Sequence, residues 1–380
     1  MTTRGFQFRL ALSCGAVAAV ALAGAALRPV RAADIGEASP GWDRAAAARY
    51  LDGREVWWQA WDRSQKDHRT LCVSCHTQAS YGMARPALRQ DLGEQGPTAA
   101  EQVMLASIEK RVHGWGNMQP FYSDVLSGAG KEIESRDAES VLNSVILSSY
   151  DVRAGHLSDT TRMAFGNAWA LQTKAGPDAG AWVWQNFNYA PWESKESQYH
   201  WAALMALAVA RAPDHYRDDP KIAANVAALT GYLHSQYEGQ PLLNKLVALW
   251  ASAAYPGLLD PGQKANLIEA LGRLQHPDGG WSLSELGPWA PRVDGTPAET
   301  RSDGYATAVT TLVLEETGAG GAQVSRGLAW LKANQDKTTG AWTAWSLNKN
   351  RDPRSDAGPF MTDAATSYAV LALEAKRPRD

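Results

Sequence analysis

The chain has 380 residues, of which 45% are hydrophobic and 20% are charged, and its formal net charge at pH 7 is −3. These values are typical of a soluble globular protein and exclude the strongly basic field of a nucleic-acid-binding chain, so we expect no nucleic-acid partner. The closing KRPRD is interpreted as a solvated tail.

The first 32 residues predict a secretory signal peptide. A basic start is followed by the apolar run LALSCGAVAAVALAGAAL and by small residues before a cleavage point after Ala32 or Ala33. We therefore expect an exported, periplasmic protein with no transmembrane span once the signal is removed. Of the three cysteines, Cys14 would leave with the signal, so the other two have a dedicated use.

Those two cysteines form the motif C-x-x-C-H with Cys72, Cys75 and His76. This spacing is typical of c-type haem attachment, in which the thiols form thioethers with the haem vinyl groups and the histidine is the proximal iron ligand. A structural zinc site would need a second ligand pair, which is missing. A thioredoxin-like redox pair would need a βαβ context, which the neighbouring sequence lacks. The motif predicts one covalently attached haem c.

Three further residues are candidates for contact with that haem. Tyr81 falls near the start of the helix that follows the motif, so we expect it to contribute to the cofactor site. Met118, in HGWGNMQPFYSD, is followed closely by a proline, as in the distal-ligand loop of small cytochromes c, and is the first candidate for the sixth iron position. His113 is the second candidate.

Helical periodicity with internal repeats predicts six helix pairs along the chain. The first helix of each pair mixes polar and apolar residues, whereas the second is small and apolar nearly all round, as an inner helix should be. The segments of the pairs are 41–61 with 80–90, 98–115 with 135–150, 168–187 with 196–212, both halves of 225–254, 271–286 with 302–316, and 328–347 with 361–375.

This alternation predicts an all-α fold, an (α/α)6 toroid of six helix hairpins over residues 42–378. Long connections within the pairs should gather on one rim. The haem motif, residues 72–76, would lie at the start of the first inner helix, which places the haem at this long-loop rim. An alternative divides the chain into a cytochrome c-like domain, 42–155, and a shorter toroid, 156–378.

Three Gln-to-Trp segments recur at Gln172/Trp182, Gln275/Trp281 and Gln335/Trp342. They resemble the QW repeats of squalene-hopene cyclases and the related prenyltransferase toroids. In that family the repeats are structural, which implies that these residues brace the fold and do no chemistry. The D-x-D-D motif that the cyclases use to protonate the polyene is absent, and so are the zinc ligands of protein prenyltransferases. The resemblance therefore disfavours cyclisation and prenylation.

Two smaller features have both a structural and a functional interpretation. Asp303 and Asp363 precede apolar helices and are interpreted first as N-caps. The aromatic run WVWQNFNYAPW, residues 182–192, packs between helices or contacts a ligand.

Together these features predict an exported monohaem c-type cytochrome built on a toroid and used for electron transfer to a redox partner protein. The alternatives are a haem-dependent oxidoreductase that acts on a small apolar, isoprenoid-like molecule in the central funnel, and a non-catalytic haem sensor. Whether the chain is an enzyme stays open, because fold alone cannot choose among activities.

Overall fold

The computed structural model describes residues 41–375, so the predicted signal peptide lies outside the described residues. Within this range the chain consists of α-helices joined by connections of different lengths, and its one sheet has two short antiparallel strands, β1 (Gln65–Lys66) and β2 (Thr70–Leu71). The prediction of an all-α fold is confirmed.

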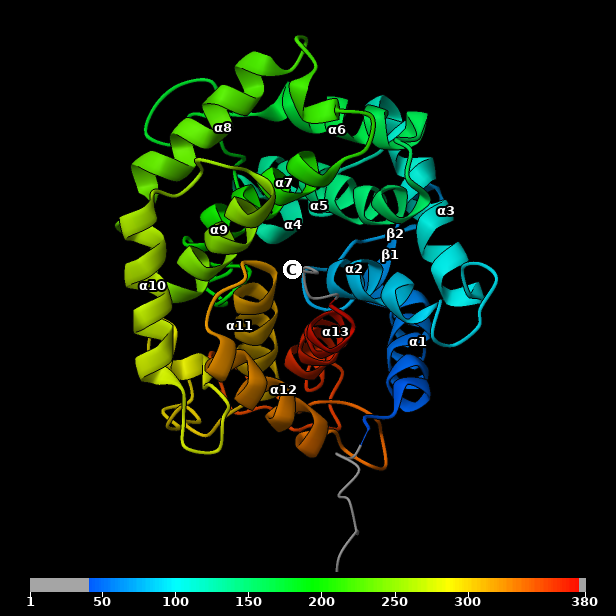
Figure 1. Cartoon of the computed structure of the whole chain (residues 1–380). Coiled ribbons are helices and arrows are strands. Elements are labelled where there is room, and N and C mark those ends of the chain that lie inside the picture. The colour runs from blue at the N-terminus through cyan, green and yellow to red at the C-terminus, as the bar shows by residue number, and fades with distance from the viewer. Residues whose placement is uncertain (1–40, 376–380) are drawn as a thin grey trace, which may run out of the picture. The chain divides into compact units, whose positions relative to one another are not determined.

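Six inner helices form a closed ring (Figure 1). Each packs against the next in chain order, and the last packs against the first, which closes the ring. The inner helices are α2 (Gln78–Leu88), α5 (Lys131–Ala154), α7 (Ser197–Arg211), α9 (Leu242–Ala254), α11 (Gly304–Glu316) and α13 (Phe360–Glu374).

Six outer helices surround this ring, which confirms the predicted toroid of hairpins. They are α1 (Arg44–Ala60), α3 (Ala99–His113), α6 (Asp159–Leu171), α8 (Ala223–Gln236), α10 (Pro261–Leu274) and α12 (Gly321–Asn334), and a short α4 (Asp124–Ser127) lies in a connection. The predicted difference between the two layers is clear in one hairpin. The outer helix α10 buries only Leu267 and Leu271, whereas the inner helix α11 buries every residue from Gly304 to Glu315.

The connections differ in length as predicted. Segments 61–77, 172–196, 275–303 and 335–359 lead from an outer helix to an inner one, and they gather on one rim of the ring. The return connection 317–320 is short. The long connections at this rim can therefore supply the side chains that line a ligand-binding pocket.

The three Gln-to-Trp segments brace neighbouring outer helices. Each glutamine Nε2 donates to a carbonyl near the start of the next outer helix: Gln172 to Asn225 (3.0 Å), Gln275 to Gln323 (2.9 Å) and Gln335 to Asp43 (2.8 Å). Each tryptophan Nε1 donates to a carbonyl near the end of the preceding outer helix: Trp182 to Ala168, Trp281 to Leu271 and Trp342 to Leu331. The tryptophan bonds satisfy carbonyls of the last helical turn, which a helix leaves unpaired, and the glutamine bonds tie each segment to the next outer helix.

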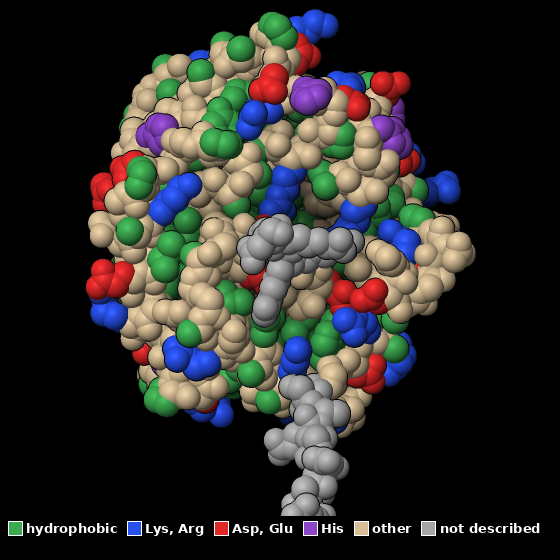
Figure 2. All heavy atoms as spheres, viewed as in Figure 1, with side chains coloured by type: hydrophobic (Ala, Val, Ile, Leu, Met, Phe, Trp, Pro, Cys, Tyr) green, Lys and Arg blue, Asp and Glu red, His purple; other side chains and the backbone are tan. Residues whose placement is uncertain are grey.

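The surface of the ring carries charges of both signs. On the face shown in Figure 2, basic, acidic and hydrophobic side chains intermix. No helix within residues 41–375 is both long enough and apolar enough to span a bilayer.

Candidate functional site

A cavity of about 370 Å³ opens at the long-loop rim. Its walls come from three connections, over residues 58–76, 185–193 and 346–361, and from Tyr122. Cys72, Cys75 and His76 all line it, so the structure brings the three residues of the predicted attachment motif into one pocket. We call this cavity the rim pocket. A second cavity, of about 340 Å³, lies among the carboxyl ends of the inner helices and contains none of the predicted site residues.

The motif is held in place by backbone contacts with the first hairpin. Cys72 N donates to Ser64 O (2.7 Å), and Trp58 Nε1 donates to Cys72 O (2.8 Å). Both thiols are buried and neither forms a disulfide. Burial raises the pKa of the Cys72 thiol to about 12, and it raises the pKa of Cys75 well above its usual value. The pocket therefore contains two neutral thiols.

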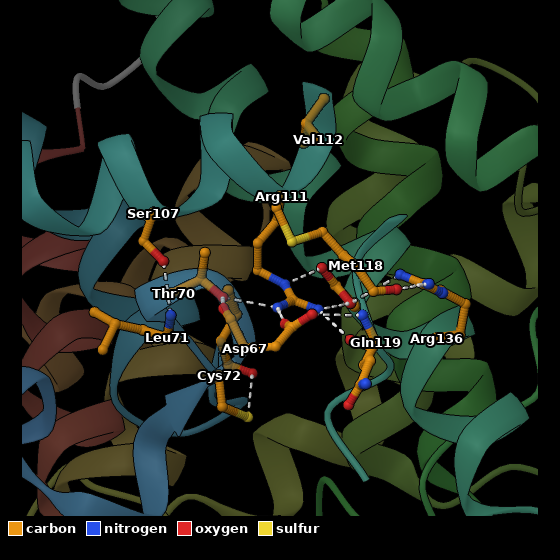
Figure 3. A network of polar contacts seen from close by, with 12 residues as sticks. Asp67, Thr70, Leu71, Cys72, Ser107, Arg111, Val112, Met118, Gln119 and Arg136 are labelled. Carbon is orange, nitrogen blue, oxygen red and sulfur yellow. Dashed lines mark hydrogen bonds and ion pairs between the residues drawn. The ribbon is translucent and has the colours of Figure 1, made fainter. Parts of the chain in front are cut away.

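A buried arginine fixes the loop that precedes the motif (Figure 3). Arg111 donates to both carboxylate oxygens of Glu139 (2.5 and 3.0 Å), to Asp67 Oδ1 (3.0 Å) and to Thr70 Oγ1 (2.8 Å). It also donates to the carbonyl of Gln119 (2.7 Å). Arg111 and Glu139 are both fully buried, and each is the nearest counter-charge of the other. Glu139 also forms a longer ion pair with Arg136 (3.7 Å).

The imidazole of His76 is confined between aromatic rings. Its ring stacks on Phe360 with centroids 3.6 Å apart, and it meets Trp58 edge-on at 5.4 Å. Burial lowers the pKa of His76 to about 3, and the cationic Arg54 and Arg351 act in the same direction. His76 is therefore neutral at physiological pH.

The same pocket contains a carboxyl group that sequence reasoning missed. Glu193 lines the cavity, and within residues 41–375 its carboxylate accepts no hydrogen bond. Burial raises its pKa to about 7, and Arg351 opposes this rise. Its only sequence signal was its position directly after the aromatic run, whose members Tyr189 and Trp192 also line the pocket.

The other predicted haem residues lie outside the pocket lining. Tyr81 is buried in α2, and its hydroxyl donates to Asp52 Oδ1 (2.8 Å). Met118 is buried, with its carbonyl bonded to Arg136, and its Cε lies 2.7 Å from where a Cβ on residue 114 would be. His113 is exposed, with Nε2 3.0 Å from Thr160 Oγ1. The sixth iron ligand stays a prediction.

The two aspartates interpreted as N-caps differ. Asp303 caps α11, because its Oδ1 accepts from Tyr305 N and Ala306 N (both 2.9 Å). Asp363 lies one turn inside α13, and its carboxylate instead accepts from side chains of the first hairpin. The N-cap interpretation is therefore wrong for Asp363.

Comparison with known proteins gives a likeness of fold. No family model and no curated protein matches the chain. Among solved structures, the GH76A α-1,6-mannanase from Salegentibacter sp. HEL1_6 is 11% identical at a TM-score of 0.51, with 87% of this chain and 99% of that chain covered. An inactive variant of it in complex with α-1,6-mannotetrose gives a TM-score of 0.52 at the same identity and coverage. At this identity the likeness establishes the fold.

These neighbours correct the predicted resemblance. The toroids found are glycosidases, so the resemblance to squalene-hopene cyclases with a haem motif is wrong. The physical reason is that the Gln-to-Trp segments bond to carbonyls near helix ends, a need of any such hairpin array. The Gln-to-Trp segments therefore indicate the toroid fold but not the substrate.

The predicted function is wrong as well. The sequence predicts a monohaem cytochrome for electron transfer, with a haem oxidoreductase or a haem sensor as alternatives, but the solved structures compared above are glycoside hydrolases. Within residues 41–375 no group of three or more His, Cys, Asp or Glu residues could hold a metal ion. The cytochrome interpretation depended on the C-x-x-C-H motif alone, because a toroid fold does not by itself indicate a function.

Proposed function

We propose that the rim pocket binds a carbohydrate chain and that Glu193 is the group that protonates a glycosidic oxygen there. The observation that carries this proposal is the unpaired carboxyl of Glu193, with a pKa of about 7, in a pocket lined by aromatic rings. The shared fold of an α-1,6-mannanase supports the choice of substrate class.

The lining suits a sugar. Trp58, Trp61 and Trp192 offer aromatic faces on which the C–H face of a pyranose ring can pack. Gln185 lines the same cavity, and its buried Nε2 makes no hydrogen bond within residues 41–375, so it can donate to a hydroxyl group. Asn348 also lines the cavity, but its amide is bonded to the backbone of Ala190. A pocket that combines apolar walls with a few polar groups is the general form of a small-ligand site.

The acid chemistry follows from the burial of Glu193. Cleavage of a glycosidic bond requires an acid that protonates the leaving oxygen, and a carboxyl with a raised pKa can do so near neutral pH. The usual mechanisms add a second carboxylate as base or nucleophile. Glu193 is the single carboxylic acid among the described residues that line the pocket, so binding and cleavage are tested separately.

The test uses α-1,6-linked mannotetraose, the sugar held by the neighbour, with calorimetry for binding and a reducing-end assay for hydrolysis. Glu193→Gln should lower hydrolysis by about a hundredfold while binding persists, because the amide cannot donate the proton. Hydrolysis by the unchanged protein should fall as pH rises through 7, since the acid must be protonated.

Glu299→Gln, a change at a partly exposed acid outside the pocket lining, is the control and should leave both binding and hydrolysis unchanged. Equal hydrolysis in Glu193→Gln and Glu299→Gln would exclude Glu193 as the acid. Failure of the unchanged protein to bind this oligosaccharide or a panel of other linkages would overturn the sugar proposal.

A second proposal concerns a cofactor and is an alternative to the first, because a haem and a carbohydrate chain would occupy the same rim pocket. We propose that haem c is attached through Cys72 and Cys75, with His76 as the protein ligand to iron. The three residues share one pocket, both thiols are free, and His76 is neutral. When bound, the haem would supply an iron centre. Arg63 and Arg351 also line the pocket and are cations of the kind that neutralise haem propionates.

Covalent attachment is tested in cells that export the chain and contain haem-attachment machinery, which fits the proposed periplasmic location. We expect one haem per chain that survives denaturing electrophoresis, and we expect Cys72→Ser with Cys75→Ser to abolish it. Ser74→Ala, between the two cysteines, is the matched control and should retain haem. Absence of covalent haem in the unchanged chain would contradict this proposal and leave the sugar proposal intact.

A further inference from the structure

A relay of hydrogen bonds links His76 to the last inner helix. His76 Nδ1 lies 2.8 Å from Thr77 Oγ1, which donates to Asp363 Oδ2 (2.8 Å). The other oxygen, Asp363 Oδ1, accepts from Tyr50 Oη and from Arg54 Nε, both at 2.8 Å. The relay therefore joins the motif loop, α1 and α13 where the ring closes.

The protons in this relay can be counted. Asp363 is 2% exposed, and this burial raises its pKa. Its ion pair with Arg54 (2.8 Å) and the hydrogen bonds that it accepts from Tyr50 and Thr77 act in the opposite direction and favour the ionised form. An ionised carboxylate only accepts, so the single hydroxyl proton of Thr77 goes to Asp363. Thr77 Oγ1 must then accept from His76, which requires a proton on Nδ1. A neutral imidazole has one N–H, and the lone pair is therefore on Nε2.

The ring has little freedom to turn away from this arrangement. Phe360 covers one face of the imidazole and Trp58 meets its edge. Within residues 41–375, His76 Nε2 makes no hydrogen bond. The nitrogen with the lone pair is thus left for whatever occupies the rim pocket, and a partner on the other ring nitrogen is how proteins usually orient a metal-ligating histidine.

We infer that Thr77 and Asp363 are positioning residues that hold His76 in its Nδ1–H tautomer, so that Nε2 is ready to ligate the iron of a haem in the rim pocket. The tautomer follows from the contacts of this chain alone. The ligation rests on the haem proposal above. Closure of the ring is therefore part of the site, because Asp363 reaches His76 only where α13 meets the first hairpin.

The test is nitrogen-15 NMR of the full chain labelled at histidine, before and after haem loading, with the His76 signals assigned by their loss in His76→Gln. Before loading, we expect Nδ1 protonated and Nε2 unprotonated. Thr77→Val should break the relay and raise the population of the His76 tautomer that is protonated on Nε2. Thr77→Ser keeps the hydroxyl and should preserve the Nδ1–H tautomer.

A second pair of variants tests the aspartate. Asp363→Asn should shift the tautomer balance, whereas Asp303→Asn, at an aspartate that caps its own helix, should not. Circular dichroism confirms folding, and if Asp363→Asn does not fold, the Thr77 pair still decides the result. An Nε2–H tautomer in the unchanged protein, or the same tautomer in Thr77→Val and Thr77→Ser, would overturn the relay. Covalent haem content, measured on separate samples, reports failure of the haem proposal independently.

Discussion

Arg111→Met should destabilise the protein by about 3–5 kcal/mol, because it removes the two close hydrogen bonds of the buried Glu139 and leaves it only the longer ion pair with Arg136 (3.7 Å). The same change removes the bonds from Arg111 to Asp67 and Thr70, so the loop before Cys72 should loosen as well. Urea unfolding followed by far-ultraviolet circular dichroism measures the loss.

Two further variants separate charge from packing. Arg111→Met combined with Glu139→Gln should recover part of the lost stability, since the fully buried side chain at position 139 is then no longer charged. Arg49→Met, at an exposed position on α1, should change stability by no more than about 0.5 kcal/mol. Equal losses in the single and double variants would show that the ion pair is not what Arg111 contributes.

Trp281→Ala should cost about 3–5 kcal/mol, because it empties the space of a fully buried indole between α10 and α12. The ring packs against Gly327 of α12, where an added Cβ would be 3.1 Å from it, so α12 loses this contact when the ring is removed. The change also removes the bond from Nε1 to the Leu271 carbonyl (2.8 Å). Thermal and urea unfolding measure the effect.

Trp281→Phe removes the Nε1 hydrogen bond but keeps an aromatic ring in the space, so it should cost less than Trp281→Ala. The difference between the two variants separates the contribution of the hydrogen bond from that of the buried volume. Trp289→Ala, at a partly exposed tryptophan on the long-loop rim, is the control and should cost less. Because Trp281 does not line the rim pocket, folded Trp281→Ala should keep the ligand behaviour of the unchanged protein. A loss no larger than that of Trp289→Ala would mean that the brace is dispensable.

The sequence by itself determined the architecture. Amphipathic and all-apolar helices alternate because an outer helix buries one stripe and an inner helix buries every side, and that difference is written in the residue pattern of segments such as 261–274 and 304–316. The clustering of Cys72, Cys75 and His76 in one pocket also follows from local spacing. The Gln-to-Trp segments were informative about the fold but misleading about the family, since a brace between helices is independent of the substrate.

Only the tertiary structure decided which residues surround the motif. Phe360 stacks on His76 and Asp363 bonds to Thr77, although about 284 and 286 residues separate the partners, because the ring brings its last inner helix against its first. Glu193 reaches the same pocket from the third hairpin, and burial there raises its pKa to about 7. Residue type and spacing do not predict which helices meet when the ring closes. The contacts of His76 and Thr77 with α13, and the low dielectric that raises the pKa of Glu193, exist only in the complete ring.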